Sequence, residues 1–120
     1  MNDQQLTPNA VALQLAQLTR ELDTLVQQMD EKEKAAVNAR EDYTMAYAKA
    51  YLSGEGSIEA RKHNATVETH DERIRAELAE QLVKGLRRQV DTLRLRVDVG
   101  RSLGAALRAE IGLANSGWQA

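Results

Sequence analysis

The sequence lacks cysteine altogether and has very few prolines and aromatic residues. None of its 120 residues is Cys or Phe, and it contains one Pro, one Trp and three Tyr. Without cysteine the chain cannot form a disulfide scaffold, a thiolate metal site or a cysteine nucleophile. A compact core usually takes much of its buried area from aromatic side chains, so a β-sandwich or a doubly wound sheet is disfavoured. The composition favours one all-α domain built on Leu, Val and Ala.

Further absences bear on location and partners. Residues 1–8 are polar and lack the basic start and the apolar run of a secretory signal. No window approaches the ~20 apolar residues that a membrane span needs. The formal net charge is −2 and the pI is about 5.7, which gives no overall attraction to nucleic acid or to an acidic membrane. We therefore expect a cytoplasmic protein that makes no membrane contact.

The first half of the chain predicts one long helix over residues 7–52, after a flexible tail at 1–6. Thr7 is a suitable N-cap, and Pro8 occupies the first helical position, where its missing N–H costs nothing. Apolar residues then alternate at steps of four and three, which is typical of a heptad seam. The large seam residues are Val11, Leu15, Leu18, Leu22, Leu25 and Met29, and the frame continues through Lys32, Ala36, Ala39, Tyr43, Ala46 and Ala50.

Three tyrosines, Tyr43, Tyr47 and Tyr51, follow one another at single-turn spacing in this helix. We expect them to pack over the small alanine residues of the seam with their hydroxyl groups in water. The alternative is a platform on which nucleic-acid bases stack.

A glycine-rich turn at residues 53–57 separates this helix from a second one, predicted over 58–114 and followed by a tail at 115–120. Ser57 is the expected N-cap, and Glu59 suits the helix dipole in the first turn. A short link between two long helices predicts an antiparallel, coiled-coil-like helical hairpin. The expected seam of the second helix is Val67, Ile74, Leu78 and Leu82, followed by Val83, Leu86, Val90, Leu93 and Val97.

The C-terminal third has more apolar surface than a two-helix hairpin can cover. A second stripe of Leu95, Val99, Leu103 and Ala106 lies on a different side of the helix from the seam, and the last residues extend beyond the start of the first helix. We predict a homo-oligomer, dimer or tetramer, through this third. The predicted interface residues are Leu95, Val99, Gly100, Leu103, Gly104, Leu107 and Ile111.

The two glycines of this interface allow two interpretations. Gly100 and Gly104 are spaced to let a partner helix approach closely in the oligomer. Alternatively, they kink the helix at 100–104 and fold residues 101–113 back as a third short helix.

Charge is unevenly distributed along the chain. Residues 1–83 hold 9 basic and 15 acidic side chains, whereas residues 84–120 hold 7 basic and 3 acidic ones. A track for nucleic-acid phosphates is one interpretation. The other is an ion-pair ladder with Asp91 and Asp98, or a contact with an acidic partner. The candidate contact residues are Lys84, Arg87, Arg88, Arg94, Arg101 and Arg108, with Arg96 adding to the basic region.

No catalytic or cofactor chemistry is evident. His63 and His70 lie seven residues apart, about 10 Å along a helix, which is too far for both to bind one metal ion within a chain. Helical zinc motifs instead place two histidines four residues apart. We predict a protein that is not an enzyme, with no catalytic residue, no metal, no cofactor and no small-molecule substrate.

Two stretches of packing residues carry a resemblance to a known family. One runs Tyr43-x-x-Ala46-Tyr47-Ala48-x-Ala50-Tyr51-Leu52 and leads into Gly56-Ser57-Ile58-Glu59-Ala60-Arg61-Lys62; the other runs Val97-Asp98-Val99-Gly100-Arg101-Ser102-Leu103-Gly104-Ala105-Ala106-Leu107-Arg108-Ala109-Glu110. They resemble small all-helical coiled-coil proteins of tailed phages, especially phages of actinobacteria, encoded near replication and recombination genes. The resemblance covers about the last two thirds of the chain and transfers no functional residue.

The resemblance implies a phage accessory protein of DNA replication or recombination in the bacterial host cytoplasm. It would bind DNA, or a recombination or replication protein, as a helical oligomer. Two other functions stay open: an inhibitor that binds a host protein, and a structural coiled-coil or virion component.

Overall fold

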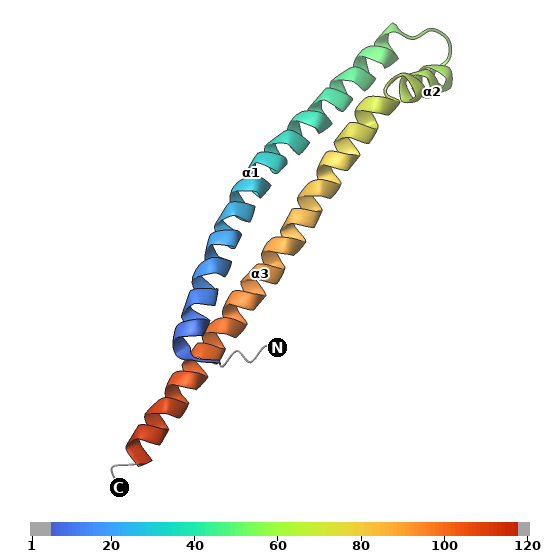
Figure 1. Cartoon of the computed structure of the whole chain (residues 1–120). Coiled ribbons are helices and arrows are strands. Elements are labelled where there is room, and N and C mark those ends of the chain that lie inside the picture. The colour runs from blue at the N-terminus through green and yellow to red at the C-terminus, as the bar shows by residue number, and fades with distance from the viewer. Residues whose placement is uncertain (1–5, 118–120) are drawn as a thin grey trace, which may run out of the picture. The chain divides into compact units, whose positions relative to one another are not determined.

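The computed structural model describes residues 6–117, and in these residues the chain forms three helices and no strand (Figure 1). Helix α1 covers Pro8–Ser53, α2 covers Ile58–Glu68 and α3 covers His70–Gly117. The all-α prediction is confirmed for this part of the chain. Of the predicted tails, residues 1–5 and 118–120 lie outside the described residues. Residues 115–117, which the sequence analysis assigned to the C-terminal tail, belong to α3.

The chain divides into two compact units, and α1 and α3 each contribute to both. The first unit consists of Met1–Val26 and Arg88–Ala120, and the second of Gln27–Arg87.

The second unit is an antiparallel helical hairpin, in which the end of α1 and the start of α3 run side by side in opposite directions (Figure 1). Gly56 has φ = +97° in the connection, a backbone conformation that favours glycine because other residues carry a Cβ. Ser57 then caps α2, and its hydroxyl oxygen accepts a hydrogen bond of 3.1 Å from the Ala60 N–H. The predicted N-cap at Ser57 is confirmed.

The predicted second helix over 58–114 is interrupted at Thr69, so the prediction of one continuous element is wrong. Thr69 is 3% exposed, with φ −105° and ψ 19°. Its hydroxyl group donates a hydrogen bond of 2.6 Å to the Ala65 carbonyl oxygen, which the Thr69 N–H also reaches at 3.1 Å. Thr19 makes the same bond to the carbonyl oxygen four residues earlier without interrupting α1, so this bond alone does not end α2. Asp71 and Glu72 then occupy the first turn of α3, where the helix dipole favours acidic side chains.

The core of the second unit is made mainly of small residues. Ala65 and Ala76 have no exposed surface, and Ala36 and Ala39 of α1 are also buried. The predicted seam through Val67, Leu78 and Leu82 is wrong, because these residues are 65%, 65% and 49% exposed. The observed seam of α3 runs through Ala76, Ala79, Val83 and Leu86 in heptad spacing. Its first residues are alanines, as are the buried residues of α1 in this unit.

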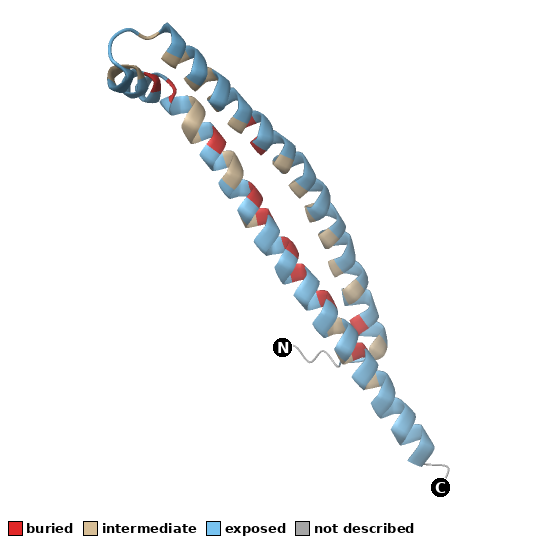
Figure 2. Ribbon diagram, turned by 180° about the vertical axis from the view of Figure 1, so that it is seen from behind, coloured by how far each residue is buried: buried red, intermediate tan, exposed pale blue. Residues whose placement is uncertain are grey.

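The first unit pairs the beginning of α1 with the later part of α3. Val90, Leu93 and Val97 of α3 are buried, as is Val11 of α1. Figure 2 shows the buried positions recurring along one side of α3. Thr7 caps α1 as predicted, because its hydroxyl oxygen accepts a hydrogen bond of 3.1 Å from the Ala10 N–H.

Helix α3 continues without interruption through Gly100 and Gly104. The predicted alternative, in which residues 101–113 fold back as a third short helix, is therefore wrong. The two glycines face α1 of the same chain. A Cβ added at Gly100 would lie 2.6 Å from Leu15 Cδ2, and one added at Gly104 would lie 3.5 Å from Val11 Cγ1. This packing explains both glycines as sites of close approach between α1 and α3.

Candidate functional site

Three exposed arginines of the first unit form a row along α3. Arg94, Arg101 and Arg108, here called the arginine row, each follow a seam residue by one position. Successive members are seven residues apart, about 10.5 Å along the helix at ~1.5 Å per residue. All three side chains are exposed, and the Arg108 guanidinium lies beside Gly104. The sequence analysis named all three as candidate contact residues, and their heptad positions place them on one edge of the helix.

No carboxylate of α1 faces the arginine row. Gly104 lies beside Val11 and Gly100 beside Leu15, so α1 and α3 are antiparallel here. In an antiparallel heptad pair, the residues one position after a seam residue lie on the same edge in both helices. These residues of α1 are Ala12, Thr19 and Val26. The Thr19 hydroxyl group is used within α1, where it donates a hydrogen bond of 2.8 Å to the Leu15 carbonyl oxygen. The α1 edge therefore offers the row neither an acidic residue nor a free hydroxyl.

The predicted ion-pair ladder along α3 does not form. Asp91 and Asp98 have the correct spacing to reach Arg94 and Arg101. Within residues 6–117, however, neither carboxylate lies within 4.0 Å of an arginine or lysine nitrogen. Across the described chain, the arginines of α3 in the first unit form no ion pair; these are Arg88, Arg94, Arg96, Arg101 and Arg108.

Lys84 and Arg87, which the sequence analysis grouped with the row, lie in an acidic setting in the second unit. Arg87 donates a hydrogen bond of 3.2 Å from Nη2 to Glu33 Oε1. Lys84 and Arg87 line a shallow groove of about 630 Å³ that also contains Glu33 and Glu80. Arg87 is therefore paired with an acidic residue of α1, and Lys84 lies in the same groove as Glu80, whereas the arginine row has no acidic residue of α1 opposite it.

A second cross-helix ion pair in that groove joins Arg40 of α1 to Glu80 of α3. The Arg40 Nε donates a hydrogen bond of 3.0 Å to Glu80 Oε2, and the Nη2 contacts the other carboxylate oxygen. This hydrogen bonding lowers the pKa of Glu80 and raises the pKa of Arg40, with the charges of Arg40 and Lys84 lowering the Glu80 pKa further. Sequence analysis missed both cross-helix pairs. They could have been predicted, because all four side chains directly follow a seam residue in the sequence, a position that faces the other helix.

The tyrosines of α1 pack in the second unit as half-buried residues. The rings of Tyr43 and Tyr47 meet edge to face with centroids 6.3 Å apart, and the Arg40 guanidinium lies 5.5 Å from the centroid of Tyr43. Tyr43 therefore contacts both Tyr47 and Arg40, as the prediction of packing residues expects.

An apolar groove occupies the opposite edge of the first unit. It measures about 520 Å³, and the contributing residues of α3 are Leu95, Arg96, Val99, Gly100 and Leu103, which face Val11, Gln14, Leu15 and Leu18 of α1. Of the predicted interface residues, Gly100 and Gly104 are covered by α1, Leu103 and Leu107 are half-buried, and Leu95, Val99 and Ile111 are exposed.

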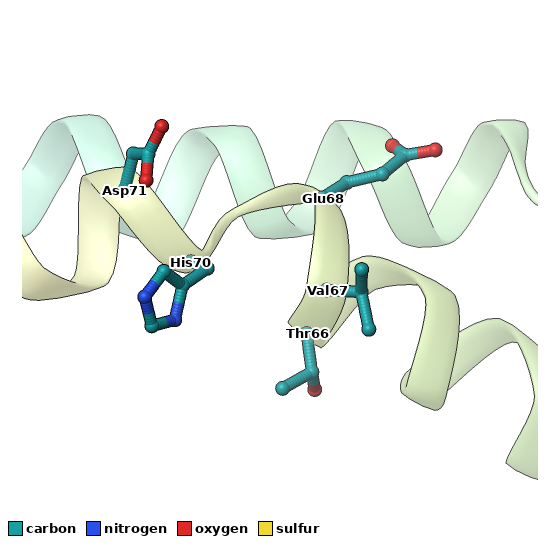
Figure 3. A pocket seen from close by; sticks show the side chains of 5 residues that line it. All are labelled: Thr66, Val67, Glu68, His70 and Asp71. Atoms are coloured by element: carbon teal, nitrogen blue, oxygen red, sulfur yellow. The ribbon is translucent and has the colours of Figure 1, made fainter.

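A third hollow lies at the break between α2 and α3. It has a volume of about 440 Å³ and is lined by Thr66, Val67, Glu68, His70 and Asp71, whose side chains project in several directions in Figure 3. His70 Nδ1 lies 3.2 Å from Arg73 Nη2. Within residues 6–117 no group of three His, Asp or Glu side chains is arranged to hold a metal ion.

None of the helices in the described part of the chain has the length and apolar character needed to cross a membrane. Comparisons with protein-family models, curated proteins and solved structures find no match to this chain.

Proposed function

We propose that this protein is a non-enzymatic accessory factor that binds the phosphate backbone of DNA through α3 of its first unit. The observation that carries the proposal is the set of five exposed arginines there that form no ion pair in the described chain, with the arginine row at their centre. An arginine that is not paired within its own protein is free to pair with phosphate, and its planar fork can do so through two hydrogen bonds.

The chemistry of the row favours duplex DNA over a single strand. Proteins that bind single strands place aromatic side chains among the cations so that bases can stack. The described residues of the first unit contain no Phe, Tyr or Trp, and the tyrosines all lie in the second unit. We propose that the row contacts phosphates, and contacts of that kind do not depend on base sequence.

The resemblance to small helical proteins of tailed phages supplies the biological setting of the proposal. We place the protein in DNA replication or recombination in the cytoplasm of the bacterial host, where it acts as a homo-oligomer. A recombination or replication protein with an acidic surface is the alternative ligand of the same arginines.

The test is the affinity for a labelled duplex oligonucleotide over a series of salt concentrations. We expect log K to fall with log salt by about 0.9 for each phosphate neutralised. Replacing the row (Arg94→Gln, Arg101→Gln and Arg108→Gln together) should reduce this slope by about 3. A matched control removes three exposed cations of the second unit, Lys34→Gln, Lys49→Gln and Arg75→Gln, and should leave the slope nearly unchanged.

Equal losses in the two triple variants would show a diffuse charge effect and reject the row as the site. Absence of binding at low salt would reject DNA as the ligand. It would favour the alternative class, a phage inhibitor that docks on a host protein or a structural coiled-coil or virion component.

A further inference from the structure

Helix α3 of the first unit carries a second heptad stripe beside the seam that packs on α1. At about 3.6 residues per turn, the stripe lies roughly a quarter of a turn around the helix from the seam and roughly opposite the arginine row. Its members, here called the outer stripe, follow at alternating steps of four and three: Thr92, Arg96, Val99, Leu103, Ala106 and Glu110. All are exposed except Leu103, which is half-buried.

Helix α1 leaves the outer stripe open. The apolar groove of about 520 Å³ runs alongside the stripe, with Val99 and Leu103 on the wall formed by α3 and with Leu15 and Leu18 on the wall formed by α1. Val99 is 60% exposed. Because α1 packs on the seam, a further helix can lie on the outer stripe beside α1, as neighbouring helices do in a bundle.

The packing of α1 on α3 gives the rule for a second antiparallel contact. Gly104 lies beside Val11 and Gly100 beside Leu15, so the four-residue step from Gly100 to Gly104 lies against the four-residue step from Val11 to Leu15. The outer stripe has the same alternation of steps. Two outer stripes that run in opposite directions can therefore meet in the same way.

Under this rule the outer stripe is complementary to a reversed copy of itself. Its central four-residue step lies against the same step of the other copy. The three facing pairs are then Val99 with Leu103, Arg96 with Ala106 and Thr92 with Glu110. The small side chain of Ala106 leaves room for Arg96 to extend along the facing helix to Glu110, which is one turn, or about 6 Å, further along.

The two charged residues of the outer stripe select both the occupant and its direction. In a parallel pair of these stripes the same positions meet, so Arg96 would lie beside Arg96 and Glu110 beside Glu110, and both contacts would be repulsive. In the antiparallel pair Arg96 of each copy approaches Glu110 of the other, which gives two attractive contacts. A second copy of α3 therefore supplies the apolar surface, the small residue and the opposite charge that this face requires.

We propose that two copies of this chain associate about a two-fold axis through their outer stripes, with the two α3 helices antiparallel. Residues 88–114 of the two helices then run side by side, and all of them belong to the first unit. The contact is isologous, so each facing pair occurs twice. The arginine rows lie on the sides of α3 that face away from the contact. The proposal does not depend on DNA binding, and it leaves both rows open to a ligand.

The first experiment measures the mass of the full-length chain without nucleic acid, by sedimentation equilibrium at concentrations up to about 1 mM, because a contact through one helix face of each copy belongs to the small, weak class. We expect a rise with concentration from 13.3 kDa toward twice that mass. Val99→Glu buries a charge in the contact and should keep the chain at 13.3 kDa. Ala105→Glu introduces the same charge at an exposed position on another side of α3 and should associate like the wild type.

The decisive experiment reverses the two charges. Arg96→Glu and Glu110→Arg each turn two attractive contacts into two repulsive ones, so each should weaken association by about tenfold or more. An equimolar mixture of the two variants restores opposite charges at both contacts of the heterodimer and should associate about as well as the wild type. Arg94→Glu makes the same change of charge on the opposite side of the helix and should have little effect.

Circular dichroism of each variant checks that the helices remain. A wild-type mass of 13.3 kDa at every concentration, association of Val99→Glu like that of the wild type, or a mixture that associates no better than its two components would each overturn the proposal. The DNA measurement has its own readout, so either proposal can fail without the other.

Discussion

The division of α3 into a buried and an exposed face predicts losses of unequal size for two leucines that are only two residues apart. Leu93 is 7% exposed and Leu95 is 64% exposed. Replacing either by Ala removes about three carbon groups, each worth about 0.8 kcal/mol when fully buried. Scaled by burial, Leu93→Ala should cost about 2 kcal/mol of unfolding free energy and Leu95→Ala less than about 1 kcal/mol. The change in helix propensity is the same at both positions and cancels in the comparison.

The assay is urea unfolding followed by far-ultraviolet circular dichroism at one fixed protein concentration, since self-association would shift the midpoint. The slope with urea should be the same in the wild type and both variants, so that midpoints compare directly. In thermal unfolding, a loss of 2 kcal/mol in a domain of this size corresponds to a midpoint lower by roughly 6–10 °C. Equal losses at the two positions, or a larger loss at Leu95, would refute the assignment of the faces.

Two further predictions concern the second unit. Gly56→Ala forces a Cβ into a backbone with φ = +97° and should lower the unfolding free energy by about 1–2 kcal/mol in urea titrations, whereas the exposed neighbour Glu55→Ala should change it little; no loss at Gly56 would contradict the strained turn. Because the hydrogen bond from Arg40 lowers the pKa of Glu80, the pair stabilises the fold above the unfolded carboxyl pKa of about 4.3 and loses this effect as pH falls through the lower folded value. The stability difference between wild type and Glu80→Gln should therefore shrink between about pH 5 and pH 3, and a constant difference over that range would contradict the ion pair.

The packing seam could be predicted where it consists of large apolar residues, but not where it consists of alanines. The caps at Thr7 and Ser57 and the heptad seam from Val83 onward follow from the sequence because oxygen-bearing caps and large apolar residues mark them. Between residues 65 and 82 the buried apolar positions are Ala65 and Ala76. Alanine carries little hydrophobic signal, so the larger but exposed leucines set the wrong frame.

The break at Thr69 has a weak local signal that periodicity overrides. Thr69-His70-Asp71-Glu72 has the spacing of a capping box, in which a threonine starts a helix and a glutamate three residues later answers it. In the structure the hydroxyl group instead bonds the Ala65 carbonyl oxygen behind it. No Gly or Pro marks the break, so whether a new helix starts at Thr69 or the preceding helix continues through it depends on tertiary packing.

The repeat of arginines every seven residues was visible in the sequence, but its division between two settings was not. Arg87 belongs to the same repeat as Arg94, yet Arg87 binds Glu33 across the helices, while heptad spacing places Ala12, Thr19 and Val26 on the edge of α1 that faces the row. Whether an arginine at this edge forms an ion pair depends on the residue that faces it from α1, because edge residues of an antiparallel pair interact across the two helices.

The contrast between these settings also explains why the row can be altered without harming the fold. The first unit is held by the seam, with Val90, Leu93 and Val97 buried against α1. The row forms no ion pair in the described chain, and exposed surface positions of that kind usually contribute within about 0.5 kcal/mol. Replacing these arginines by glutamine therefore removes charge while the helices stay packed. A change in salt-dependent binding in that variant reports on the ligand of the row, whereas the same substitution at Arg87 would also break a contact that joins α1 to α3.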